Sequence, residues 1–219
     1  EFRRVLFRSN GDRPLGSRLS TMTLAISLLN RDRSNNFVET GTTRKNIYTH
    51  PKVEDRAADG SSTLLFADYA NTYGGKVWTC DINEINIENC KIATKEYENL
   101  INYIVDDSVN FLEKFDKPID FLYLDSLDSE SPFAHKHQLK EIEAAYPKLH
   151  NESIVLLDDL GSKTDLSIKF LKQNNWCQIN IDIPRPSHYN NFMQGLFVKE
   201  EFLYINHSLI PQHLRFKDL

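Results

Sequence analysis

The chain has 219 residues, of which 40% are hydrophobic and 26% charged, and its formal net charge at pH 7 is −5. This length suits one α/β domain with extensions, and the negative balance argues against a nucleic-acid partner, which needs a basic face. No apolar run approaches the ~20 residues that span a bilayer, so no membrane partner is expected. The three cysteines form no CxxC pair and no even disulfide set, which is typical of a reducing, cytoplasmic location.

Residues 1–18 contain five arginines but no sustained hydrophobic period. We expect this segment to be disordered or foreign to the natural chain, and we set it aside when predicting the fold. A single domain is expected over residues 19–199, with a C-terminal tail over residues 200–219. From Leu19 to Leu29 the apolar residues recur at a spacing that predicts a helix.

Short apolar runs then alternate with helical segments along the chain. The predicted strands cover residues 37–40, 76–81, 101–105, 120–125, 153–157, 176–183 and 192–198. Helices are predicted from Ser61 or Ser62 to Gly74, over residues 85–97, from residue 108, and over residues 132–149 and 165–174. The link between the last two strands is too short for a crossover helix, so the last strand should be antiparallel to its neighbour.

Acidic residues close several of these strands. They are Glu39, just before a turn at Gly41, then Asp81, Asp125 and the pair Asp158-Asp159. In an open α/β sheet, ligands bind outside the carboxyl ends of the strands, so we expect one crevice lined with carboxylates. A glycine at this edge lets the backbone approach a ligand, because no Cβ is in the way.

This ordered set of residues resembles the class I S-adenosylmethionine-dependent methyltransferases, over roughly Leu19 to Lys199. The resemblance implies an α/β fold, a Rossmann-like three-layer sandwich with a seven-stranded, mostly parallel sheet whose last strand is antiparallel. It also implies S-adenosylmethionine as the cofactor. Cofactor-binding roles are carried over to residues at the strand ends and helix starts: Glu39, Gly41, Thr42, Ser61, Ser62, Asp81, Ile82, Asp107, Ser108 and Asp125.

Within that class the chain is most similar to small O-methyltransferases of the catechol type and of the sugar or macrolide type. Those enzymes bind magnesium through acids after their fourth and fifth strands, which implies Asp125, Asp158 and Asp159 as ligands of Mg²⁺ here. Carboxylate oxygens are the hard ligands that Mg²⁺ prefers, and a bound metal lowers the pKa of an acceptor hydroxyl. The alternative for Asp158-Asp159 is a turn that caps the next helix.

The proton of a hydroxyl acceptor must be removed during methyl transfer. The catechol-type enzymes use a lysine three positions after the strand-four aspartate, but Asp128 stands at that position here. The candidate catalytic residues are therefore Asp125, Asp128 and His137. For Asp128 a solvated loop acid, and for His137 a surface histidine, remain open alternatives.

The sequence thus predicts a methyltransferase that acts on a hydroxyl of a small molecule or sugar with divalent metal assistance. One alternative is a non-catalytic S-adenosylmethionine-binding protein. Another is a nicotinamide-dependent oxidoreductase, which is weakened because no GxGxxG follows the first strand. Acceptor specificity is expected in the segments 43–59, 126–137 and 184–191, and a homodimer is left open.

Overall fold

The computed structural model describes residues 18–43, 61–179 and 194–205. Residues 1–17, 44–60, 180–193 and 206–219 lie outside these ranges, as do the predictions that fall on them. Arg18, in contrast, is described and its side chain is buried.

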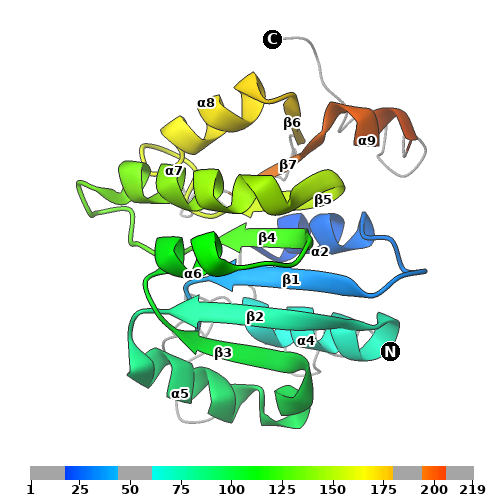
Figure 1. Cartoon of the computed structure of the whole chain (residues 1–219), viewed down its shortest axis with the longest axis vertical. Coiled ribbons are helices and arrows are strands. Elements are labelled where there is room, and N and C mark those ends of the chain that lie inside the picture. The colour runs from blue at the N-terminus through cyan, green and yellow to red at the C-terminus, as the bar shows by residue number, and fades with distance from the viewer. Residues whose placement is uncertain (1–17, 44–60, 180–193, 206–219) are drawn as a thin grey trace.

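A seven-stranded sheet forms the middle layer (Figure 1). Its strands are β1 (Asn35–Thr40), β2 (Gly75–Asp81), β3 (Ile101–Val105), β4 (Ile119–Leu124), β5 (Leu149–Leu157), β6 (Trp176–Ile179) and β7 (Gly195–Lys199). The spatial order is β3-β2-β1-β4-β5-β7-β6. β1 to β5 pair in parallel, whereas β7 pairs antiparallel with both β5 and β6. The predicted fold, with its antiparallel last strand, is confirmed.

Helices cover both faces of this sheet (Figure 1). The α-helices are α2 (Leu19–Ser27), α4 (Ser62–Tyr73), α5 (Glu84–Ala93), α6 (Ser108–Lys114), α7 (Ala134–Ala145), α8 (Asp165–Gln173) and α9 (Glu200–Ile205), and the 3-10 helices are η2 (Lys95–Leu100) and η3 (Tyr146–Lys148). One hydrophobic cluster joins α2, α4 and α9 to the sheet. A second cluster joins α6, α7 and α8 to the opposite face. None of the helices in the described ranges is long and apolar enough to cross a bilayer.

The central strand β4 shows why the sheet forms in this way. Its sequence, Ile-Asp-Phe-Leu-Tyr-Leu, is buried at every position, as expected for a parallel strand with helices on both sides. Phe121 stacks among Phe37 and Phe66 on one face, while Leu122 and Leu124 belong to the cluster on the other. These contacts fix β1 and β4 side by side, and so they fix the relative position of the residues that follow them.

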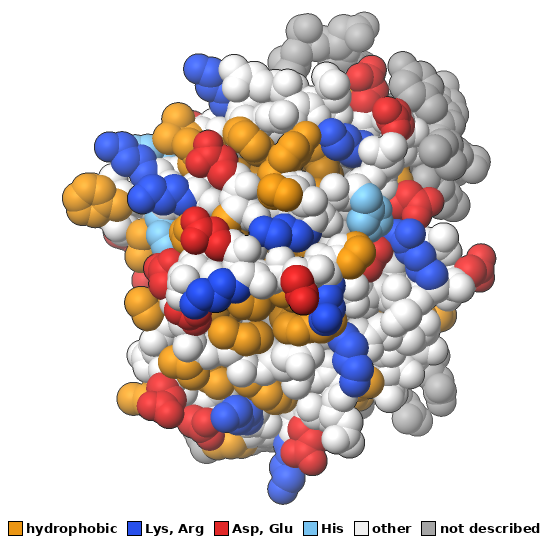
Figure 2. All heavy atoms as spheres, viewed as in Figure 1, with side chains coloured by type: hydrophobic (Ala, Val, Ile, Leu, Met, Phe, Trp, Pro, Cys, Tyr) orange, Lys and Arg blue, Asp and Glu red, His pale blue; other side chains and the backbone are white. Residues whose placement is uncertain are grey.

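The surface over α6 and α7 carries charges of both signs. Figure 2 shows Lys and Arg side chains interspersed with Asp and Glu side chains on this face. An evenly mixed surface of this kind produces no strong local field of one sign. The prediction that the chain has no nucleic-acid partner stays a prediction, because this view covers one face.

Candidate functional site

The strand register aligns the strand-end acids in one row. Thr40 at the end of β1 pairs with Cys80 of β2 and with Leu124 of β4, and Leu124 pairs with Leu157 of β5. The residues that come next, Gly41, Asp81, Asp125 and Asp158, therefore meet at the carboxyl edge of the sheet. This is the edge at which open α/β sheets bind their ligands.

Glu39 is turned into the protein and is fully buried. Its carboxylate accepts hydrogen bonds from the hydroxyls of Ser62 and Thr63, at the start of α4, and from Thr79 of β2 at 2.8 Å. Burial raises the pKa of Glu39 to about 7, although the three hydroxyls oppose this shift. Glu39 thus fixes the start of α4 to the first two strands, and a direct contact with a cofactor stays a prediction.

The neighbouring residue Ser61 precedes α4 in a left-handed conformation, with φ 44° and ψ 32°. Its buried Oγ has no hydrogen-bond partner among the described residues, and the same holds for Oγ of Ser126, which follows Asp125. Buried hydroxyls usually have hydrogen-bond partners. A polar ligand bound at this edge would supply the partners that these two hydroxyls lack. Ser62 differs, because its hydroxyl is already engaged by Glu39.

Gly41 is required by a close approach of two strand ends. Its φ is +79°, and a Cβ at this position would lie 2.2 Å from the carbonyl oxygen of Asp125. Its N–H donates to the carbonyl oxygen of Cys80 at 2.8 Å. The backbone that approaches Gly41 is therefore that of Asp125, and the predicted contact with a cofactor is not needed to explain the glycine.

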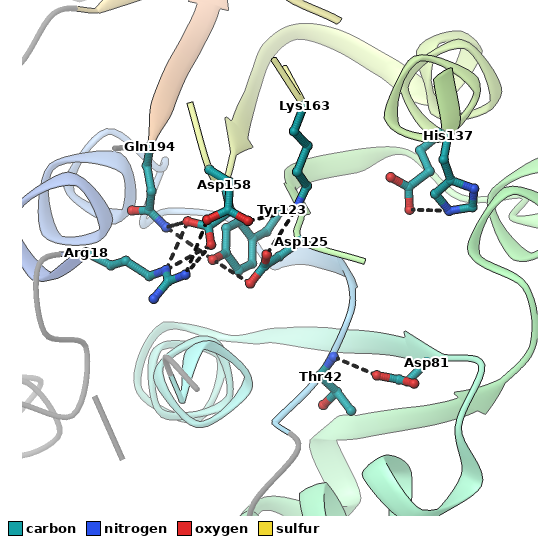
Figure 3. A network of polar contacts seen from close by, with 11 residues as sticks. Arg18, Thr42, Asp81, Tyr123, Asp125, His137, Asp158, Lys163 and Gln194 are labelled. Atoms are coloured by element: carbon teal, nitrogen blue, oxygen red, sulfur yellow. Dashed lines mark hydrogen bonds and ion pairs between the residues drawn. The ribbon is translucent and has the colours of Figure 1, made fainter. Parts of the chain in front are cut away.

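Asp81 joins the turn after β1 to the turn after its own strand. Its Oδ2 accepts from the Thr42 N–H at 3.3 Å (Figure 3) and from Asn86 Nδ2 at 3.1 Å, while Oδ1 accepts from the Asn83 N–H at 2.8 Å. The cap of α5 is Asn83, which accepts from the Ile85 N–H. Asp81 is half-buried. The next residue, Ile82, is 75% exposed.

A second polar group lies between α6 and α7. Asp107 is exposed and caps α6 by accepting from two backbone N–H groups. Ser108 Oγ lies 2.9 Å from His137 Nε2, and the same nitrogen lies 3.7 Å from Oε1 of the fully buried Glu141. Figure 3 shows His137 on α7, well apart from Asp125. The structure thus places the catalytic candidate His137 with Ser108 and not with the acidic cluster.

The three acids predicted as metal ligands do converge. One carboxylate oxygen from each of Asp125, Asp158 and Asp159 lies within 4.8 Å of the others. The two adjacent acids reach this arrangement because Asp159 has a positive φ of 57°, which turns its side chain away from the strand direction. The N-cap residue of α8 is Thr164, so the predicted alternative role of Asp158-Asp159 as a helix cap is wrong.

Two cations already pair with these acids (Figure 3). Lys163 Nζ lies 3.3 Å from Asp125 Oδ1 and 3.1 Å from Asp159 Oδ2. The Arg18 guanidinium binds both oxygens of Asp158, with Nε at 2.9 and 3.0 Å and a closer contact from a terminal nitrogen. Bidentate pairs of this kind are the strongest that arginine forms with carboxylates.

Two further side chains complete the cluster. Gln194, just before β7, donates from Nε2 to Asp158 Oδ1 at 2.9 Å and to the Tyr123 hydroxyl at 3.1 Å. The Tyr123 hydroxyl donates to Asp125 Oδ2 at 3.3 Å. The Gln194 Oε1 atom is buried and has no partner among the described residues, so this side chain presents a further unpaired acceptor.

The charges shift the pKa values of the two strand-end acids in opposite directions. Enclosure by protein and the neighbouring Asp158 carboxylate raise the pKa of Asp125 well above its ordinary value. Burial also acts to raise the pKa of Asp158, but the Arg18 guanidinium outweighs it and the pKa is lowered. Burial acts to lower the pKa of Lys163, and the carboxylates of Asp125 and Asp159 reverse this and raise it. Lys163 is therefore a fixed cation and not a base.

The acidic cluster does not fit a divalent cation in this arrangement. Its donor chemistry is suitable, since three carboxylate oxygens lie close together. However, Lys163 already contacts one oxygen of Asp125 and one oxygen of Asp159, and both oxygens of Asp158 are engaged by Arg18. A divalent ion would therefore have to displace these two cations or lie beside them.

Sequence reasoning missed the residues that neutralise the cluster. The one signal for Lys163 is its position four residues after Asp159, which suits an ion pair across one turn. Arg18 carries no such signal, because it stands 140 residues before its partner. The predicted base Asp128 is exposed in the loop between β4 and α7, and the structure does not bring it to the acidic cluster.

Comparison with known proteins gives a domain match over part of the chain. The family described as a methyltransferase domain matches residues 57–160, slightly less than half of the chain. This stretch runs from just before α4 to the end of β5, so it contains Asp81, Asp125 and Asp158. No curated protein matches the chain.

Several solved methyltransferase structures share the fold. An rRNA methylase from Streptococcus thermophilus is 14% identical with a TM-score of 0.56, covering 87% of this chain and 99% of that chain. A protein of Streptococcus mutans, assigned as a methyltransferase and solved with S-adenosylhomocysteine, is 14% identical with a TM-score of 0.55, covering 82% and 96%. An S-adenosylmethionine-dependent O-methyltransferase from Thermotoga maritima is 13% identical with a TM-score of 0.55, covering 82% and 64%. At these identities the likeness shows the fold and leaves the acceptor open.

Proposed function

We propose that this chain is a class I S-adenosylmethionine-dependent methyltransferase that transfers a methyl group to a hydroxyl of a small molecule or sugar; its sheet order and its domain match support this assignment. The observation that carries the proposal is the position of Asp125. Its carboxylate stands at the end of the central strand, its backbone touches the Gly41 turn, and its side chain is 32% exposed. An acid so placed is accessible to an acceptor at the edge where the cofactor is expected.

The residues at this edge suit S-adenosylmethionine. Asp81 offers carboxylate oxygens to the two ribose hydroxyls, as acids at this position do in dinucleotide folds, and Ser108 stands where the adenine is expected. The unpaired Oγ of Ser61, with the first amides of α4, offers donors to the carboxylate of the cofactor. When bound, the cofactor supplies a methyl group that is activated for nucleophilic attack by its attachment to sulfonium sulfur.

The chain's own part in the reaction is to hold the acceptor in line and to remove its proton. Asp125 accepts the hydroxyl proton as the new oxygen–carbon bond forms and the carbon–sulfur bond breaks. The raised pKa of Asp125 supports this role, because a stronger carboxylate base takes a hydroxyl proton more readily. Lys163 and Tyr123 each contact one oxygen of Asp125 and so fix its orientation.

Metal-assisted transfer is the second candidate, and it is favoured by the convergence of Asp125, Asp158 and Asp159 within 4.8 Å. It would bring a divalent ion close to the Lys163 ammonium, which contacts one oxygen of Asp125 and one of Asp159. The two candidates share the acceptor class and differ in their response to divalent cations.

The experiment begins with a calorimetric titration of S-adenosylhomocysteine and, in parallel, of NADH. We expect the first to bind and the second not to bind; the reverse result would favour an oxidoreductase. Transfer of labelled methyl from S-adenosylmethionine to a panel of hydroxylated and aminated acceptors then tests the acceptor class. Cofactor binding without transfer to any member would favour a non-catalytic binding protein.

Two variants then test the base. Asp125→Asn should retain S-adenosylhomocysteine binding but lose transfer by about 100-fold or more, the typical contribution of a general base. Glu130→Gln, in an exposed acid of the following loop, is the matched control and should transfer normally. If Asp128→Asn abolished transfer and Asp125→Asn did not, the exposed loop acid would be the base.

A further inference from the structure

The acidic cluster at the end of β4 and β5 contains its own cations. We propose that the Lys163 ammonium and the Arg18 guanidinium take the place of a divalent metal, so that the cluster neither binds nor needs one. This inference rests on the proposed function for the location of the site, but its test measures cation binding and not methyl transfer.

Lys163 is held in position by its surroundings. Its side chain is only 1% exposed, and Nζ is shared between Asp125 Oδ1 and Asp159 Oδ2. The turn that carries it is fixed by Asp159, with φ 57°, and by Thr164, whose hydroxyl bonds to the backbone of Gly161 at both its N–H and its carbonyl oxygen. A buried ammonium with two carboxylate partners is costly to displace, because moving it away leaves both acids unpaired.

A metal and this ammonium compete for the same space. A divalent ion ligated by Asp125 and Asp159 lies about 2.0–2.6 Å from their oxygens. Lys163 Nζ already lies 3.3 and 3.1 Å from one oxygen of each of these carboxylates. A divalent ion bound between the same two acids would therefore lie close to a buried ammonium, and two positive groups at short distance repel each other.

Arg18 pairs with Asp158, the third acid of the cluster. Its guanidinium engages both oxygens of Asp158, its side chain is 9% exposed, and it also lies 4.0 Å from Asp159 Oδ1. Gln194 adds a neutral donor to Asp158. Three carboxylates thus face two cations, which leaves one negative charge on the cluster. A divalent ion added to both cations would make the cluster net positive.

The proposal predicts that removing the Lys163 charge creates a metal site. Mn²⁺ is the probe, and its binding to the full chain is followed by the loss of the free-ion signal in electron paramagnetic resonance. The wild-type chain should bind no Mn²⁺ at this cluster. Lys163→Met removes the charge and leaves a side chain of similar length. This variant should bind one Mn²⁺ per chain, with an affinity at least about tenfold higher than that of any Mn²⁺ binding by the wild-type chain.

Two further variants locate the bound ion and test the charge. Lys163→Arg keeps the charge and should remain without Mn²⁺. Adding Asp159→Asn to Lys163→Met should abolish the new binding. If Lys163→Met does not give a cooperative thermal unfolding transition, Lys163→Gln replaces it as a polar variant of similar length.

Two results would overturn the proposal. One is Mn²⁺ binding to the wild-type chain that Asp159→Asn removes. The other is a folded, uncharged Lys163 variant that gains no binding. None of the Mn²⁺ experiments uses the cofactor. A chain that failed to bind S-adenosylhomocysteine would therefore refute the proposed function, whereas the Mn²⁺ results would still test the present proposal.

Discussion

Glu39 and Thr79 lie opposite each other in the β1–β2 register, and the Thr79 hydroxyl donates to Glu39 Oε2 at 2.8 Å. Two more hydroxyls reach the same carboxylate from the start of α4. Among the described residues this fully buried carboxylate has no cationic partner, so it should affect how the stability of the chain depends on pH.

Glu39→Gln should change this dependence in a defined window. The folded pKa is raised from 4.5 to about 7, so between these values the folded chain binds more protons at this site than the unfolded chain. The contribution of Glu39 to the free energy of unfolding is therefore complete below pH 4.5 and is lost as the pH rises to about 7. Glutamine does not titrate, so the variant should gain stability relative to the wild type across this window, by about 3 kcal/mol in total. Urea unfolding at a series of pH values measures the difference, and a difference that stays constant with pH would contradict the assignment.

Gly41→Ala should destabilise the chain more than Gly161→Ala does. Both glycines have positive φ, +79° and +148°, so either substitution strains the backbone by about 1–3 kcal/mol. At Gly41 the new Cβ also meets the Asp125 carbonyl oxygen at 2.2 Å, whereas at Gly161 nothing lies within 4 Å. We expect Gly41→Ala to cost about 1–3 kcal/mol more, the usual cost of overpacking. Equal midpoints of urea unfolding would show that the strand ends separate easily.

Asp81→Asn should weaken binding of S-adenosylhomocysteine. Asp81 is half-buried, and its oxygens are already ordered by Asn83 and Asn86, so it is prepared to accept from ribose hydroxyls. Hydrogen bonds to a charged group contribute about 1.5–3 kcal/mol, so we expect at least about a tenfold loss of affinity by calorimetry. Asp116→Asn, in an exposed acid between α6 and β4, is the control. Unchanged affinity in Asp81→Asn would place the ribose elsewhere.

Asp120→Ala should cost more stability than Glu152→Ala, although both acids pair with Arg33. Asp120 is buried and also accepts from the Asn36 N–H at 2.7 Å and contacts His150 Nε2 at 3.1 Å. Its removal leaves the Asn36 N–H and the half-buried His150 without this partner, at a cost of about 1–3 kcal/mol. The Glu152 side chain is 41% exposed, so we expect its loss to cost less than about 1 kcal/mol. Chemical denaturation of the two variants compares them directly, and similar losses would mean that water replaces the partners of Asp120.

Much of the fold was predictable because its strands follow general rules. A run such as Phe121–Leu124, apolar at each position, suits only a strand covered on both faces. The last two predicted strands left too few residues between them for a crossover helix, which predicts the antiparallel pairing that the structure shows. The same logic predicted that Asp81, Asp125 and Asp158 share an edge, because parallel strands end on the same side.

The partners of those acids could not be predicted, because side-chain contacts between distant segments leave no periodic signal. The Arg18–Asp158 pair joins the start of α2 to the end of β5. The direction of Asp159 depends on a positive φ that no sequence pattern indicates for this residue. Likewise, the placement of His137 beside Ser108 depends on how α7 packs against α6, a contact that helical spacing alone leaves undefined.

The position of β7 determines the order in which the sheet can be completed. This strand is the last of the seven to be synthesised, yet it lies between β5 and β6. Until residues 195–199 leave the ribosome, β5 has an open edge on that side and β6 has no neighbour to join. The five parallel strands can assemble earlier, since all of their pairings lie within residues 35–157. A nascent chain that stalls before Gly195 would therefore carry an unpaired apolar strand edge, the feature that invites association with other chains.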